Sequence, residues 1–122
     1  ILVVDDEVDV RALFEQRFRK EIRDKEMVFA FAHSGQEALN YLNGINRESI
    51  LILSDINMPG MNGLELLKHI KDEFEKPPPV VVMISAFGDE ENYRNAMSLG
   101  ADDFLTKPLN FGHLREKLVQ LS

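Results

Sequence analysis

The sequence predicts a single α/β domain, built on a doubly wound, five-stranded parallel sheet with helices on both faces. Five short apolar runs alternate along the chain with segments whose apolar residues recur at helical spacing. The three clearest runs, 1–4, 50–53 and 80–84, contain no polar residue, which is typical of strands buried on both faces of a parallel sheet. A chain of 122 residues, 44% of them hydrophobic, can bury one such core and is too short for a second.

Two strands and two helices are expected in the first third of the chain. Residues 1–4 form the first strand, and because the sequence opens inside this run, we expect its first residues to have been trimmed. Helical spacing predicts a helix over 10–22, and a second strand follows over 27–32. Ser34 and Glu37 have the spacing of a capping box, in which each side chain accepts the backbone amide of the other at the start of a helix.

The third and fourth strands enclose a turn and a third helix. The third strand is expected over 50–53, and the turn formers in 57–63 lead into the helix. Its apolar face is formed by Leu64, Leu67, Ile70 and Phe74. A triple proline, 77–79, ends this helix and precedes the fourth strand, 80–84.

The last part of the chain repeats the pattern. Asp89 is a suitable N-cap for a helix that stops at Gly100, because glycine is favoured just beyond helix ends. A short fifth strand is expected over 102–105. Apolar residues at 3-4-3 spacing in 111–121 predict a final helix that packs on the core. The alternative is that the same stripe continues as a coiled coil into an output domain or a dimer partner.

Composition argues against several classes of protein. The chain has 14 Lys and Arg against 21 Asp and Glu, a net charge of −7, so this domain is not expected to bind nucleic acid or an anionic membrane directly. It has no cysteine, which excludes disulfides, thiolate zinc sites and thiol nucleophiles. No apolar run is long enough to span a membrane. We interpret the three histidines as ordinary surface residues: His33, His69 and His113.

The order of the elements places the polar residues at one edge of the sheet. Right-handed crossovers give the flavodoxin-like strand order 2-1-3-4-5, with sites beyond the carboxyl ends of the strands near the change in order. Asp5 and Asp6 follow the first strand, and Asp55 follows the third. Ser85 ends the fourth strand, and Lys107 lies just past the fifth.

These residue types point to phosphoryl transfer. Three carboxylates in one place repel one another unless they are neutralised, and a divalent cation together with Lys107 would balance them. Oxygen ligands without imidazole favour Mg²⁺, which also binds phosphate oxygens. Asp55, on the central strand, is the best candidate nucleophile, with Asp5 and Asp6 as metal ligands. Lys107 would pair with the phosphoryl oxygens, and Ser85 would donate a hydrogen bond to them.

At these residues the chain resembles a known family. The segments concerned are Asp5-Asp6-Glu7, 54–63, Ser85-Ala86 and 100–108. Together they resemble the receiver domain of two-component response regulators over essentially all of residues 1–122. The resemblance implies a cytoplasmic module in which Asp55 accepts a phosphoryl group from a histidine kinase or a histidine phosphotransfer protein. It also implies that Asp6, Asp55 and the Asn57 main-chain carbonyl bind Mg²⁺ directly, while Asp5 acts through water.

The resemblance further implies a conformational switch. Ser85 and Phe104 match the hydroxyl–aromatic pair of the family, with serine for the commoner threonine and phenylalanine for the commoner tyrosine. Because Phe104 has no hydroxyl, switching is expected to depend on burial of its ring. Lys107-Pro108 matches the family's lysine with a cis peptide bond after it. The fourth helix, 89–100, has few apolar residues, so we expect phosphorylation to shift the face made by this helix, the fifth strand and the last helix.

Three other functions are alternatives to this one. A pseudo-receiver would bind proteins without being phosphorylated, although the complete acidic set and the lysine argue against it. A magnesium-dependent phosphoester hydrolase would need a second aspartate two residues after its nucleophile, where this chain has Asn57. A flavin-binding protein would need hydroxyls and amides in its first loop, where Asp5-Asp6-Glu7 would repel phosphate. We therefore expect a signalling module that catalyses only its own phosphorylation and dephosphorylation, and not a metabolic enzyme.

Overall fold

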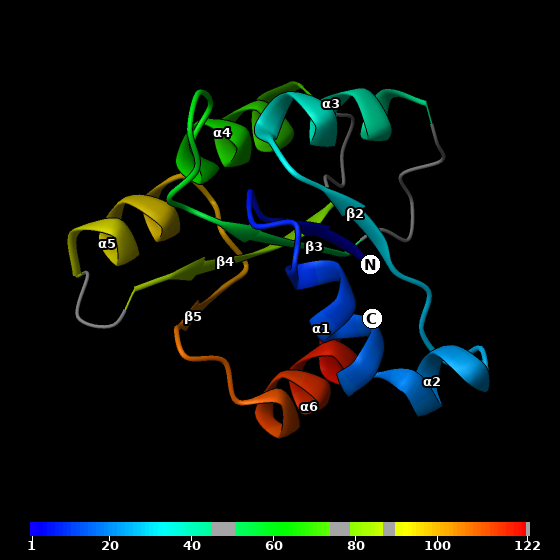
Figure 1. Ribbon diagram of the computed structural model, residues 1–122. Helices are drawn as coiled ribbons and strands as arrows, with labels where there is room; N and C mark the ends of the chain where they lie inside the picture. The colour runs from blue at the N-terminus through cyan, green and yellow to red at the C-terminus, as the bar shows by residue number, and fades with distance from the viewer. Residues whose placement is uncertain (45–50, 74–78, 87–89, 122) are drawn as a thin grey trace.

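The structure, a computed structural model, describes residues 1–44, 51–73, 79–86 and 90–121 (Figure 1). The strands are β1 (Leu2–Val4), β2 (Ala30–Ala32), β3 (Leu51–Asp55), β4 (Val80–Ser85) and β5 (Asp103–Thr106). The helices are α1 (Val10–Arg17), α2 (Arg19–Arg23), α3 (Gly35–Asn43), α4 (Gly63–Glu73), α5 (Glu90–Ser98) and α6 (Phe111–Leu121). Five residues with predicted roles lie outside the described residues: Ile50, Phe74, Pro77, Pro78 and Asp89.

The predicted topology is confirmed. The five strands form one parallel sheet in the order β2-β1-β3-β4-β5. Leu2 of β1 pairs with Ala30 on one side and with Ile52 of β3 on the other, so the order of connection reverses at β1. Within the described residues, no helix combines the length and the apolar character that a bilayer crossing requires.

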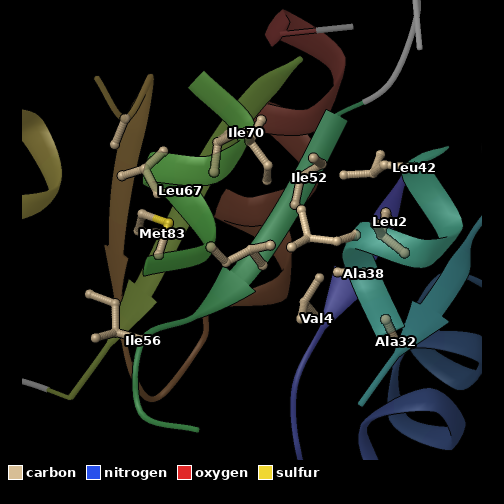
Figure 2. Packing of buried hydrophobic residues seen from close by; sticks show 14 of the residues in the cluster. Leu2, Val4, Ala32, Ala38, Leu42, Ile52, Ile56, Leu67, Ile70 and Met83 are labelled. Atoms are coloured by element: carbon tan, nitrogen blue, oxygen red, sulfur yellow. The ribbon is translucent and has the colours of Figure 1, made fainter. Parts of the chain in front are cut away.

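Helices cover both faces of the sheet, and each face has its own core. Helices α3, α4 and α5 lie on one face, and α1 and α6 lie on the other (Figure 1). Figure 2 shows part of the first core, where Leu42 of α3 and Leu67 and Ile70 of α4 pack over Ile52 and Met83 of the central strands. The second core is rich in phenylalanine. Because β3 is buried along its whole length, it contributes alternate side chains to the two cores.

The first predicted helix, 10–22, is interrupted, which corrects the expectation of one continuous helix. Phe18 separates α1 from α2, with φ −111° and ψ 24°, outside the helical region. Its fully buried ring lies 5.8 Å from that of Phe14 and 5.2 Å from that of Phe29. The guanidinium of Arg115 in α6 donates a 2.9 Å hydrogen bond to the carbonyl of Arg17, just before the bend. Packing and this external donor therefore stabilise a bend at a position without glycine or proline.

Two smaller expectations also need correction. The second strand was expected over 27–32, but the structure has it over Ala30–Ala32, where it pairs with Leu2–Val4 of β1. The capping box is only half formed: the Glu37 amide donates to Ser34 Oγ (3.0 Å), as expected. The Glu37 carboxylate accepts the amide of His33 (2.8 Å), one residue before the expected partner.

Candidate functional site

The predicted site residues lie at the carboxyl edge of the sheet. Asp55 and Ser85 are the last residues of β3 and β4, and Asp5 directly follows β1. Lys107 directly follows β5, and its amide donates to the Ser85 carbonyl (2.8 Å), which fixes the lysine beside the end of β4. The Lys107-Pro108 peptide bond is cis, as the family resemblance implied.

Asp55 occupies the centre of the site and is only 4% exposed. Its Oδ2 accepts a 2.7 Å hydrogen bond from the ammonium of Lys107, and its Oδ1 accepts the Asn57 amide at 3.1 Å. Burial lowers the pKa of Lys107, but the hydrogen bond and the charge of Asp55 outweigh it and raise that pKa above its ordinary value. The lysine is therefore a permanent cation next to the candidate nucleophile.

The acidic cluster has the composition of a magnesium site. Asp5, Asp6 and Asp55 each offer a carboxylate oxygen within 4.8 Å of the others. Burial, with a contribution from the charge of Asp55, raises the pKa of Asp5 above its ordinary value. Mg²⁺ prefers carboxylate and carbonyl oxygens and keeps several waters, so three carboxylates gathered this closely fit such an ion. Asn57 is exposed just beyond Asp55.

Ser85 has an unusual environment. Its side chain is fully buried, and Oγ is the one buried side-chain nitrogen or oxygen in the described part of the chain that has no hydrogen-bond partner. An unpaired buried hydroxyl is unfavourable and calls for a functional explanation. At the end of β4, beside β3, the hydroxyl lies next to the strand that carries Asp55.

A family model described as the response regulator receiver domain matches residues 1–119. The chain belongs to this family. The predicted family and fold are thereby confirmed.

Curated relatives of the receiver domain carry additional sequence. The domain is 37% identical over 122 residues to the protein-glutamate methylesterase/protein-glutamine glutaminase of Trichodesmium erythraeum. This match covers 98% of this chain and 33% of the relative. It is 32% identical over 121 residues to the response regulator RppA of Synechocystis sp., covering 99% of this chain and 49% of RppA. The chain thus spans about half or less of the length of these relatives.

Solved receiver structures have the same fold. The receiver domain of NtrX from Brucella abortus is 34% identical with a TM-score of 0.80, and the match covers 98% of this chain and 95% of that one. The chemotaxis protein CheY4 of Vibrio cholerae is 25% identical with a TM-score of 0.79, covering 99% and 96% of the two chains.

The predicted switch face of the receiver domain is the one formed by α5, β5 and α6. Phe104 of β5 is half-buried, and its ring makes an edge-to-face contact with that of Tyr93 in α5 at 5.2 Å. Only Ala96 of α5 is buried, while Tyr93 and Met97 are 49% and 40% exposed. The expected shortage of apolar anchors in this helix is confirmed.

One residue at the site, His33, is not among those predicted from the sequence. It follows β2, and its Nδ1 lies 3.0 Å from the main-chain carbonyl oxygen of Asp5 in a partly buried contact. The interpretation of His33 as an ordinary surface residue is therefore wrong. Residue type alone gave no signal, but the predicted strand order did: β2 is the neighbour of β1, so the residue after β2 had to lie near Asp5.

Proposed function

We propose that this receiver domain is a phosphorylation-controlled module of a cytoplasmic two-component phosphorelay, with Asp55 as the phosphoryl acceptor. The observation that carries the proposal is the surrounding of Asp55: a lysine ammonium 2.7 Å from one of its oxygens and the carboxylates of Asp5 and Asp6 within 4.8 Å. The donor is a histidine kinase or a histidine phosphotransfer protein. An oxygen of Asp55 attacks phosphorus, a P–O bond forms as the P–N bond of phosphohistidine breaks, and the donor imidazole leaves with the electron pair.

The acidic cluster serves to hold Mg²⁺. Asp6, Asp55 and the main-chain carbonyl of Asn57 are the proposed direct ligands, and Asp5 contacts the ion through water. When bound, the ion supplies positive charge to the phosphoryl oxygens. Burial is the main cause of the raised pKa of Asp5, and the charge of Asp55 adds to it, so these carboxylates are suited to a neighbouring cation.

Two further residues of the chain complete the acceptor site. The Lys107 ammonium changes its partner from Asp55 Oδ2 to an oxygen of the incoming phosphoryl group, because that group carries the larger negative charge. The Ser85 hydroxyl donates a hydrogen bond to another phosphoryl oxygen, so the buried and unpaired Oγ gains a partner. Ser85 ends β4 and Lys107 directly follows β5, so the sheet holds both residues in place before the reaction.

The output of the domain is a change on the α5–β5–α6 face. Movement of the Ser85 hydroxyl towards the phosphoryl group leaves room for the Phe104 ring to turn inward from its contact with Tyr93. Helix α5, anchored by Ala96, follows with little resistance. The partner that reads this face is an output domain of a longer protein or a second copy of the domain, and the module itself does not turn over a metabolite.

Intact-mass measurement with Mg²⁺ and acetyl phosphate tests the acceptor. One phosphoryl adduct is expected, absent without Mg²⁺ and absent in Asp55→Asn, but retained in Asp72→Asn, a matched change of an exposed aspartate in α4. An adduct that survives in Asp55→Asn contradicts the assignment. No adduct from acetyl phosphate or from a phosphohistidine protein favours the pseudo-receiver alternative. If phosphorylation occurs and amide exchange in α5 and β5 stays unchanged, the switch proposal is wrong.

A further inference from the structure

The turn after β2 lies directly against the turn that carries the acidic pair. Because β2 pairs with β1 in parallel, the two turns that follow them emerge side by side (Figure 1). His33 is the first residue after β2, and its ring contacts the Asp5 carbonyl at 3.0 Å. A carbonyl oxygen only accepts hydrogen bonds, so Nδ1 is the donor in this contact and carries the proton.

This contact completes the backbone bonding of Asp5. The Asp5 amide donates to the carbonyl of Ala32 at 3.0 Å, and the Asp5 carbonyl accepts from the ring of His33. The consecutive residues Ala32 and His33 therefore bind both main-chain polar groups of Asp5. The carbonyl belongs to the planar peptide unit that leads to Asp6. Holding that oxygen therefore fixes the plane from which the Asp6 side chain projects. The β1 ladder cannot do so, because its pairing ends at Val4.

His33 is itself anchored to a helix. Its amide donates to Glu37 Oε2 at 2.8 Å, and the Glu37 amide donates to Ser34 Oγ at 3.0 Å. Glu37 belongs to the first turn of α3, which packs on the core through Ala38. The main chain of His33 is thus held by the Glu37 carboxylate, and the next residue, Ser34, is held by the Glu37 amide, so the turn that carries the imidazole is fixed to a rigid helix.

We propose that His33 is a positioning residue of the magnesium site, which sets the direction in which Asp5 and Asp6 present their carboxylates. The inference rests on the proposed function, because it assigns a role at the same acidic cluster. Residues that orient metal ligands through hydrogen bonds typically change metal affinity by about 10- to 100-fold when they are replaced. Since His33 acts through a peptide group and not through a ligand oxygen, we expect the lower end of that range.

Magnesium titration of the unphosphorylated domain, followed by backbone amide chemical shifts, tests this role. His33→Leu removes the donor and is expected to weaken Mg²⁺ binding about 10-fold. His33→Asn places an amide nitrogen where Nδ1 now lies and is expected to keep the wild-type affinity. His69→Leu, a matched change of an exposed histidine on α4 that contacts Glu73, is expected to have no effect.

The outcomes separate this inference from the function on which it rests. If wild-type protein binds no Mg²⁺, the proposed function fails and the inference with it. If wild-type protein binds Mg²⁺ and His33→Leu binds equally tightly, only the positioning role is wrong. Equal losses in His33→Leu and His33→Asn also overturn it, because a loss of imidazole packing would then explain both. Rescue by asparagine alone supports the hydrogen bond as the cause.

Discussion

Gly63 is the point at which α4 comes closest to the backbone that carries Asp55, and replacing it by alanine tests that geometry. A Cβ at residue 63 lies 2.2 Å from the Asp55 carbonyl oxygen and 2.7 Å from Ile56 Cα, well inside the 3.4 Å at which ordinary contact begins. Neither atom can yield easily. The Ile56 amide donates to Ile84 (3.0 Å), and its carbonyl accepts the Gly63 amide (2.8 Å).

The expected magnitude follows from two opposing effects. Overpacking of a buried region costs about 1–3 kcal/mol, and a clash with backbone belongs at the upper end. The better helix propensity of alanine returns at most about 1 kcal/mol. We therefore expect Gly63→Ala to lower the free energy of unfolding by about 2 kcal/mol. The displacement falls on residues 55–57, so phosphorylation of Asp55 is expected to decrease as well.

Urea unfolding followed by circular dichroism measures this effect, and Gly112→Ala is the matched control. Gly112 lies in α6, and its Cβ would approach only the Asn110 side chain, at 3.4 Å. The same substitution is therefore expected to stabilise the domain there, by up to about 1 kcal/mol. A loss at Gly63 no greater than about 0.5 kcal/mol, the usual scatter of surface changes, would refute the reasoning.

Three further substitutions and one control substitution have expected outcomes that denaturant unfolding can check. Lys25→Gly should stabilise the domain by about 0.5–1 kcal/mol, because Lys25 has φ 59°, and an unchanged midpoint would contradict this. Asp5→Asn should stabilise the metal-free protein at neutral pH, because burial and neighbouring carboxylates raise the pKa of Asp5. The gain should disappear as the pH falls through that raised pKa towards the ordinary value of 3.8, and a gain independent of pH would contradict the cause. Arg115→Ala should cost about 2 kcal/mol, since it leaves Glu21, whose side chain is 10% exposed, without its 3.0 Å partner. Arg23→Ala removes an exposed ion pair and should change stability by less than about 0.5 kcal/mol, so equal effects at the two arginines would argue against burial as the cause.

The sequence was sufficient to predict the sheet and the position of most polar residues at its carboxyl edge. Each buried strand is an apolar run that stops at a polar residue, so Asp55 and Ser85 could be assigned to strand ends without coordinates. The parallel order then brought them together with Asp5 and Lys107, as the structure has them. These predictions succeeded because they depend on local periodicity and on a general rule of chain connection.

The features that sequence could not supply depend on contacts between distant segments. The bend at Phe18 involves a hydrogen bond from Arg115, 98 positions beyond its acceptor Arg17. The predicted strand order brings His33 near Asp5, but the 3.0 Å contact also depends on how the two turns fold, which periodicity does not describe.

The two cores differ in side-chain chemistry, which gives each face of the sheet its own spectroscopic label. The phenylalanines of the α1–α6 core are Phe14, Phe18, Phe29, Phe31 and Phe111, and the methionines of the opposite core are Met58, Met61 and Met83. In the described part of the chain, methionine methyl resonances therefore report mainly on the α3–α4–α5 side, and phenylalanine ring resonances report mainly on the other. Met27, which packs on the phenylalanine-rich core, and Phe104, which packs with the methionine side, are the exceptions. Among the phenylalanines that the structure describes, a fluorinated Phe104 would accordingly follow the switch region apart from the five rings across the sheet.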